Sequence, residues 1–156
     1  MKNKWVQYLA TGLGFGFSPV LPGTCGTLWG LPLAWAVAQL PALTFQIVAC
    51  MALALLAVPV CSAAEKQLGK GKDPGCIVAD EYCTLPMVYL GLPLTPGVLL
   101  SGFILHRIFD IIKPPPIRQL QSLKGGIGIV IDDFVAALFA LACNQLLFRV
   151  VLPALK

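Results

Sequence analysis

The chain has 156 residues, of which 58% are hydrophobic and only 12% are charged, and its mean hydropathy is +0.84. Soluble globular domains carry about 25% charged residues, so this composition excludes an ordinary soluble domain and indicates an integral membrane protein. The net charge is +4, yet no charged residue lies between Lys4 and Glu65, a pattern typical of a chain that crosses a bilayer.

Residues 1–26 form a segment rich in glycine and proline. Lys2 and Lys4 precede apolar residues as in a signal peptide, but the glycines, the prolines and the lack of a cleavage pattern predict a segment of the mature protein. The sequence GFSPVLPGTCGT leads into an apolar run. Backbone N–H groups at a helix start, with threonine hydroxyls beside them, favour phosphate binding; a plain turn is the alternative. The residues concerned are Gly23, Thr24, Gly26 and Thr27.

Two apolar runs follow. Residues 27–40 are short for a full span of about 20 residues, so we expect a tilted or partly inserted helix there. Residues 42–64 carry no charge and are the strongest prediction of a transmembrane helix, with a bend near Pro59.

The rest of the chain predicts further helices. Asp73 before Pro74 is typical of a helix start, and the sequence GLPLTPG at residues 91–97 must end that helix. A second helix over about residues 98–112 ends at KPPP. Residues 82–105 carry no charge, so this pair of helices resembles a hairpin reaching into the membrane. The last span covers about residues 127–151. The predicted fold class is all-α: one domain over residues 1–156, a polytopic membrane helical bundle of short, partly broken helices.

Basic residues predict the orientation of the bundle. The positive-inside rule places lysine- and arginine-rich segments in the cytoplasm, and the acidic motifs lie beside those segments. We therefore expect the helix ends to bring their carboxylates together in one cytoplasm-facing polar site. The basic residues concerned are Lys2, Lys4, Lys66, Lys70, Lys72, Lys113, Arg118 and Lys124.

The acidic residues indicate a metal site. Ionised carboxylates in apolar runs are costly unless they are compensated. A cluster of carboxylates without histidine or thiolate partners suits a hard cation, Mg²⁺ before Ca²⁺ or Mn²⁺. The alternatives are that Asp73 only caps a helix, that Arg107 and Asp110 form a local ion pair, and that each acid is neutralised separately. The paired acids are Asp80, Glu81, Asp132 and Asp133.

Four blocks together resemble the phosphatidylglycerophosphatase A family of magnesium-dependent bacterial membrane enzymes. These blocks are GFGFSPVLPGTCGTLWG (14–30), DPGCIVADE (73–81), RIFDIIKPPPI (107–117) and GGIGIVIDDFVAA (125–137). The resemblance implies a lipid phosphomonoesterase of phospholipid biosynthesis that hydrolyses phosphatidylglycerophosphate to phosphatidylglycerol and phosphate. It implies a multi-pass protein of the bacterial inner membrane with its active site on the cytoplasmic side, with the lipid substrate and the membrane as partners and no nucleic acid.

The resemblance also implies roles for matching positions. The expected catalytic residues are Asp80, Asp133, Arg107 and Lys113. The expected Mg²⁺ ligands are Asp80, Glu81, Asp132, Asp133, Asp73 and Asp110. The expected phosphate-side turn contains Pro22, Gly23, Thr24, Gly26 and Thr27. This chain departs from the usual family pattern at three positions. Thr84 and Ala137 stand where glycine is common, and His106 stands where phenylalanine is common. These departures concern the fine geometry of the site and its substrate preference more than the type of reaction.

The expected mechanism uses Mg²⁺ to neutralise the phosphate and orient a water for in-line attack. Asp80 or Asp133 acts as general base, and Arg107 and Lys113 stabilise the developing charge. An aspartyl-phosphate intermediate is the alternative. Competing functions are a phosphatase for another lipid or prenyl phosphate, a small divalent-cation transporter with acids spread through the membrane, and a structural or lipid-binding membrane protein.

Overall fold

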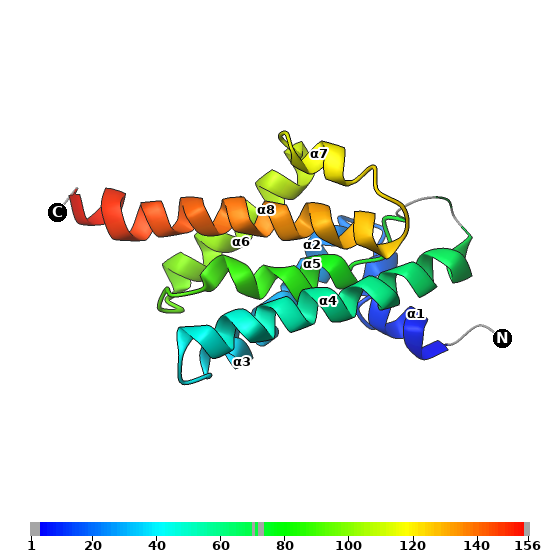
Figure 1. Ribbon diagram of the computed structural model, residues 1–156, viewed down its shortest axis with the longest axis horizontal. Helices are drawn as coiled ribbons and strands as arrows, with labels where there is room; N and C mark the ends of the chain where they lie inside the picture. The colour runs from blue at the N-terminus through cyan, green and yellow to red at the C-terminus, as the bar shows by residue number, and fades with distance from the viewer. Residues whose placement is uncertain (1–3, 70, 72–73, 155–156) are drawn as a thin grey trace.

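The computed structural model describes residues 4–69, 71 and 74–154, and these residues form helices with no β-strand among them (Figure 1). The expectation of an all-α chain is confirmed over this part. The helices are α1 (Lys4–Ala10), η1 (Phe15–Phe17), α2 (Pro22–Leu28), α3 (Gly30–Ala38), α4 (Leu43–Leu68), α5 (Ala79–Thr84), η2 (Leu85–Tyr89), α6 (Pro96–Ile112), α7 (Ile117–Leu120), α8 (Gly126–Leu146), η3 (Leu147–Val151) and α9 (Leu152–Ala154).

Two stretches of helix have the length and the composition of membrane spans. They are Leu43–Leu68, which is α4, and Gly126–Ala154, which comprises α8, η3 and α9. Both coincide with runs that the sequence predicts as spans. The short run after residue 27 is divided instead between α2 and α3, which meet at Trp29. Pro59 lies inside α4, and the helix continues past it to Leu68.

The helix predicted to start at Pro74 starts instead at Ala79, and this part of the prediction is wrong. The reason is tertiary. The Val78 N–H donates to the Ala10 carbonyl at the end of α1 (2.8 Å), and the Ile77 N–H closes a turn onto Pro74. These bonds hold residues 74–78 outside a helix. Asp80 and Glu81 therefore lie in the first turn of α5, and not two turns in. Asp73, the expected helix cap, lies outside the described residues.

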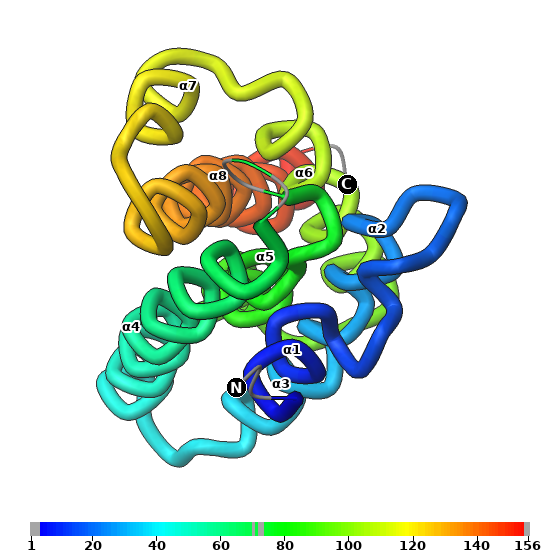
Figure 2. Tube along the Cα trace, turned by 90° about the vertical axis from the view of Figure 1, so that its right-hand side faces the viewer, coloured from blue at the N-terminus to red at the C-terminus, as the bar shows by residue number. Residues whose placement is uncertain are grey.

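The segment formed by α5 and η2 occupies the centre of the bundle. Seen end-on, α5 lies in the middle, with α4, α1, α3, α2, α6 and α8 around it (Figure 2). Residues 77–81 and 83–89 are buried without a break, so this segment meets protein on all sides. Its position explains how a short acidic sequence comes to lie among these helices.

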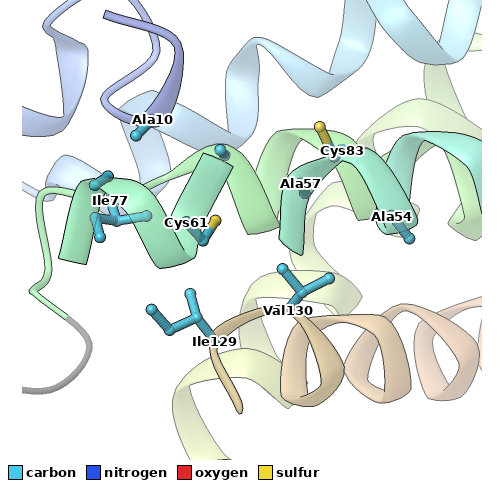
Figure 3. Close-up of a cluster of buried hydrophobic side chains, with 10 residues drawn as sticks. Ala10, Ala54, Ala57, Cys61, Ile77, Cys83, Ile129 and Val130 are labelled. Atoms are coloured by element: carbon cyan, nitrogen blue, oxygen red, sulfur yellow. The ribbon is translucent and has the colours of Figure 1, made fainter. Parts of the chain in front are cut away.

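Small residues allow the helices to approach the centre closely. Buried positions on α4 recur every three or four residues and carry only alanine or cysteine: Cys50, Ala54, Ala57, Cys61 and Ala64. Figure 3 shows part of this stripe facing Ile129 and Val130 of α8. Small side chains at a helix interface permit close backbone packing in membranes.

Gly126 is a point of close approach between α8 and α4. Its N–H donates to the Ser62 hydroxyl (2.8 Å), and a Cβ atom at this position would overlap with the Val58 carbonyl oxygen. Gly126→Ala is therefore expected to lower the free energy of unfolding by about 1–3 kcal/mol through overpacking. Thermal unfolding of the purified chain in detergent measures this effect.

Gly97→Ala is the matched control. A Cβ atom at Gly97 of α6 would meet only ring carbons of Phe148, at 3.6 and 3.7 Å, which is ordinary contact. The control should unfold within a few degrees of the unmodified chain. Equal unfolding temperatures for the two variants would contradict the close approach at Gly126.

Candidate active site

Four helices contribute charged or hydroxyl side chains to one buried cluster. α5 contributes Asp80 and Glu81, which are 7% and 8% exposed, and α8 contributes Asp132 and Asp133, which are each 2% exposed. The C-terminal end of α6 adds Arg107, Asp110 and Lys113, and α2 adds Thr27. Burial of so many carboxylates is unfavourable unless cations or hydrogen-bond donors face them, so their partners decide what the cluster can do.

Arg107 joins three of the four helices. Its Nη1 atom donates to Glu81 Oε2 on α5 at 2.7 Å, to Asp110 Oδ2 one turn along α6 at 2.8 Å, and to Thr27 Oγ1 on α2 at 3.3 Å. The local ion pair with Asp110 is therefore present, but it is one part of a larger network. A guanidinium can make several directed contacts of this kind with oxygen acceptors.

Lys113 connects α6 to α8. Its Nζ atom lies 2.5 Å from Asp132 Oδ2 and 3.7 Å from Asp110 Oδ1. Burial opposes the charged ammonium, but the hydrogen bond and charge of Asp132, with Asp133 and Asp110, outweigh that effect and raise the pKa of Lys113. Lys113 also has a left-handed backbone, with φ of 47°, at the C-cap of α6. A strained backbone at a non-glycine residue is often found at functional sites.

Asp133 has the most acidic surroundings in the cluster. The charges of Asp110, Asp80 and Glu81 lie close to its carboxyl group. Asp133 Oδ2 is buried, and no residue within the described ranges forms a hydrogen bond with it. The acids also outnumber the two cations, Arg107 and Lys113. This part of the cluster is therefore suited to an added proton or a cation.

Glu81 contacts α2 as well as Arg107. The buried Thr27 hydroxyl lies within hydrogen-bonding distance of the Glu81 carboxylate and of the Gly23 carbonyl (2.8 Å). Burial raises the pKa of Glu81 to about 7, although the Arg107 charge opposes this shift. A carboxyl with a pKa near neutrality is suited to proton transfer.

Gly23 lets α2 lie directly against this ion pair. A Cβ atom there would lie 2.5 Å from Glu81 Oε1 and 2.9 Å from Arg107 Nη2. Of the five residues expected in the phosphate-side turn, Gly23 and Thr27 thus reach the acid cluster. Gly26 approaches Val78, and Pro22 and Thr24 are half-buried in α2. Asp73, an expected metal ligand, lies outside the described residues.

The carboxylates of the cluster are the kind of donor that hard cations prefer, but they do not converge on one point. No group of three or more histidine, cysteine, aspartate or glutamate side chains is arranged to hold a metal ion within residues 4–69, 71 and 74–154. Arg107 and Lys113 occupy positions between the acids. The donors are carboxylate oxygens, which Mg²⁺ prefers, and Asp133 Oδ2 is buried without a hydrogen-bonding residue in the described chain.

His106 is a buried polar residue beside this cluster, at one of the positions where the sequence departs from the family pattern. Its side chain is fully buried on α6, next to Arg107, and neither ring nitrogen has a hydrogen-bond partner among the described residues. The sequence offers one signal, because the resembling family commonly has phenylalanine at this position.

His106→Phe is expected to stabilise the chain. Each unsatisfied buried polar group costs about 1–3 kcal/mol, and phenylalanine has a similar shape without nitrogen atoms. We expect a higher thermal unfolding temperature in detergent for His106→Phe and a lower one for His106→Ala, which leaves a cavity. A lower temperature for the phenylalanine variant would contradict this expectation.

A protein-family model and two of the relatives found by comparison carry the same name. The family model described as Phosphatidylglycerophosphatase A matches residues 8–148. Phosphatidylglycerophosphatase A of Escherichia coli (strain K12) is 35% identical over 142 residues, which cover 90% of this chain and 81% of that protein. The protein of the same name from Haemophilus influenzae is 35% identical over 137 residues, covering 86% and 83%.

A third relative has a different name. The Bacteroides thetaiotaomicron protein named "Putative phosphatidylinositol-3-phosphatase" is 32% identical over 137 residues, which cover 85% of this chain and 86% of that protein. No solved structure matches the chain.

Proposed function

The chain belongs to the phosphatidylglycerophosphatase A family and is a phosphatase, and we propose that it hydrolyses phosphatidylglycerophosphate to phosphatidylglycerol and phosphate in phospholipid biosynthesis. The observation that carries this proposal is the buried cluster in which Arg107 contacts acids from α5 and α6 and the Thr27 hydroxyl of α2. Such a cluster combines donors for phosphate oxygens with carboxylates for proton transfer.

We further propose Mg²⁺ as the cofactor. Asp80, Asp132 and Asp133 are its proposed ligands, with Glu81, Asp110 and Asp73 as further members of the set. The all-oxygen donor set and the buried Asp133 Oδ2 support this assignment. When bound, Mg²⁺ supplies neutralisation of the phosphate charge and activation of a water as nucleophile.

The residues of the chain then have separate tasks. Arg107 and Lys113 bind the phosphate oxygens and stabilise the charge that develops on them. Asp80 or Asp133 takes a proton from water as the water oxygen bonds to phosphorus. The bond from phosphorus to the ester oxygen breaks, and that oxygen receives the proton from the same carboxyl. Because Asp133 is buried, bulk water does not compete for the proton that its carboxyl group holds.

The proposed orientation places this site at the cytoplasmic face of a multi-pass protein. The C-terminal end of α4, the N-terminal end of α8 and α7 lie at the same end of the molecule (Figure 1). Lys66, Arg118 and Lys124 lie at or near these elements. A concentration of basic residues at one end supports a cytoplasmic position for that end.

Phosphate release by the purified full-length chain tests the proposal. In detergent, we expect release from phosphatidylglycerophosphate with Mg²⁺ and loss of release when EDTA removes the metal. Absence of release with Mg²⁺ present contradicts the proposed function. If EDTA does not affect the release of phosphate, the assignment as a phosphatase stands and the assignment of Mg²⁺ is refuted.

A second candidate substrate follows from the Bacteroides relative, whose name refers to a phosphoinositide. The same assay with phosphatidylinositol 3-phosphate decides between the two lipids. A higher kcat/KM for the phosphoinositide would replace the proposed substrate and keep the reaction type.

A further inference from the structure

Thr27 of α2 lies inside the protein beside the ion pair of Glu81 and Arg107, and its side chain is 0% exposed. Its hydroxyl lies within hydrogen-bonding distance of the Glu81 carboxylate and 2.8 Å from the Gly23 carbonyl oxygen, and it accepts a hydrogen bond from Arg107 Nη1 at 3.3 Å. A threonine hydroxyl has one hydrogen and two lone pairs. Its hydrogen and at least one lone pair are therefore used by contacts within the protein.

This burial separates Thr27 from a substrate that enters the site from outside. A side chain without exposed surface offers no surface to a phosphate. Gly23 lies one turn earlier on the same face of α2, and a Cβ atom there would lie only 2.5 Å from Glu81 Oε1. The face of α2 that contains Gly23 and Thr27 therefore packs directly against the side chains of the site.

The contacts of Thr27 bear on the orientation of Arg107. The hydrogen bonds from Arg107 to Glu81, Asp110 and Thr27 all leave from Nη1. The Glu81 Oε2 atom that accepts from Nη1 also contacts the Thr27 hydroxyl, so these three residues form a closed set of contacts between three helices. Because a guanidinium is planar, contacts that hold Nη1 also set the direction of its other amino group, Nη2.

The other two threonines with less than 2% exposure have no such contacts with site side chains. Thr84 on α5 donates to the backbone carbonyls of Asp80 (2.8 Å) and Glu81 (3.3 Å). Thr11, after α1, donates to the carbonyl of Gln7 (2.8 Å). Bonds of this kind stay within one segment of the chain, whereas the hydroxyl of Thr27 also reaches two charged side chains on other helices.

We propose that Thr27 is a positioning residue for the reaction: its hydroxyl holds the Glu81 carboxylate and Arg107 Nη1 in one arrangement, which directs Nη2 at the phosphate without a contact between Thr27 and the substrate. The proposal rests on the proposed function, in which Arg107 binds the phosphate oxygens. It replaces the phosphate contact that the resemblance implies for Thr27. Loss of the hydroxyl misplaces a phosphate donor and does not remove one.

Thr27→Val tests the proposal, because valine replaces the hydroxyl by a methyl group. With the full chain in detergent, phosphatidylglycerophosphate and Mg²⁺, we expect kcat to fall about tenfold to hundredfold, because Arg107 stabilises charge that develops during the reaction. We expect KM to change by less than about threefold. Thr27→Ser retains the hydroxyl and should keep kcat within about threefold of the unmodified chain. Thr27→Ala gives the same test if the valine methyl group does not fit beside Glu81.

Thr11→Val is the matched control. The Thr11 hydroxyl is buried, donates to the Gln7 carbonyl at 2.8 Å and accepts from the Gly14 N–H at 3.2 Å. The change therefore removes contacts of the same kind as Thr27→Val does, but none of them involves a residue of the candidate site. We expect kcat to be unchanged in this variant. Thermal unfolding in detergent shows that both variants are folded when they are assayed.

A combined variant distinguishes a positioning residue from a phosphate ligand. Arg107→Lys lacks the forked guanidinium through which Thr27 acts, so adding Thr27→Val to it should lower kcat by less than about twofold further. The full loss in that background would show that Thr27 contacts the phosphate itself, and it would overturn the proposal. An unchanged kcat in Thr27→Val, or a Thr27→Ser variant as impaired as Thr27→Val, also overturns it.

The unmodified chain separates this proposal from the proposed function. If it releases no phosphate, the proposed function fails and the positioning role fails with it. If it releases phosphate and the Thr27 variants give one of the contrary results, the positioning role alone fails.

Discussion

Asp133→Asn is expected to lower kcat/KM for phosphate release by about 10²–10⁴-fold. Asparagine keeps the size of the side chain but neither carries the charge nor accepts a proton at neutral pH. Asp133 is 2% exposed, with the charges of Asp110, Asp80 and Glu81 nearby. The lost charge therefore removes a metal donor or the general base at the most acidic part of the cluster. Phosphate release from phosphatidylglycerophosphate with Mg²⁺ measures the effect.

Glu65→Gln is the control for this exchange. It converts a carboxylate to an amide near the end of α4, at a residue with no role in the proposed mechanism, and we expect activity within about twofold of the unmodified chain. An Asp133→Asn variant that keeps more than a tenth of the activity would argue that Asp133 is neither ligand nor base. Asp80→Asn and Asp132→Asn extend the test, and full activity in both would refute the metal site.

Arg107→Ala is expected to reduce both stability and activity. The change removes the donor to Glu81, Asp110 and Thr27 and leaves a nearly buried glutamate without its counter-charge. Breaking a buried pair from one side costs of the order of 3 kcal/mol. Loss of a phosphate-binding cation adds a loss of kcat/KM of about 10²-fold or more. Thermal unfolding in detergent and phosphate release measure the two effects separately.

Two further arginine variants separate charge from geometry. Arg107→Lys retains the positive charge but not the forked donor set, so we expect it to recover stability more than activity. Arg149→Ala removes one hydrogen bond to the Gly91 carbonyl (2.5 Å) at an exposed position and should change activity by less than about twofold. If Arg107→Ala behaves like Arg149→Ala in both measurements, Arg107 does not hold the site together.

The positions of helices were predictable where they depend on residues within the helix itself or next to it in the sequence. The apolar run in residues 42–64 and the last run from residue 127 correspond to α4 and to α8 with its continuation, because hydropathy and the absence of charge act along a single helix. The end of α6 at Ile112 was also predictable, since prolines follow at once. The start of α5 was not, because its position depends on a hydrogen bond from Val78 to Ala10 of another helix.

In the candidate site, too, the sequence predicts some features, whereas others depend on contacts between helices. The adjacent pairs Asp80–Glu81 and Asp132–Asp133 are visible in the sequence, and their placement in apolar runs is enough to mark them. The sequence showed the pairing of Arg107 with Asp110, three residues apart, as a local contact. It did not show the bond from Arg107 to Glu81 or the contact of Lys113 with Asp132, because these partners lie on different helices.

The sequence by itself determined that this protein is a helical chain of membrane-like composition, that its acids occur in pairs, and that its motifs resemble those of one phosphatase family. Those properties depend on residue type and on spacing along the chain. Only the tertiary structure decided that Thr27 meets Glu81, that Gly23 lies against Arg107, and that the apolar side chains of Leu100, Ile104 and Ile108 on α6 stay exposed. Helix periodicity predicts which residues share a face, but which faces meet and which stay exposed depends on the packing of small buried residues between helices.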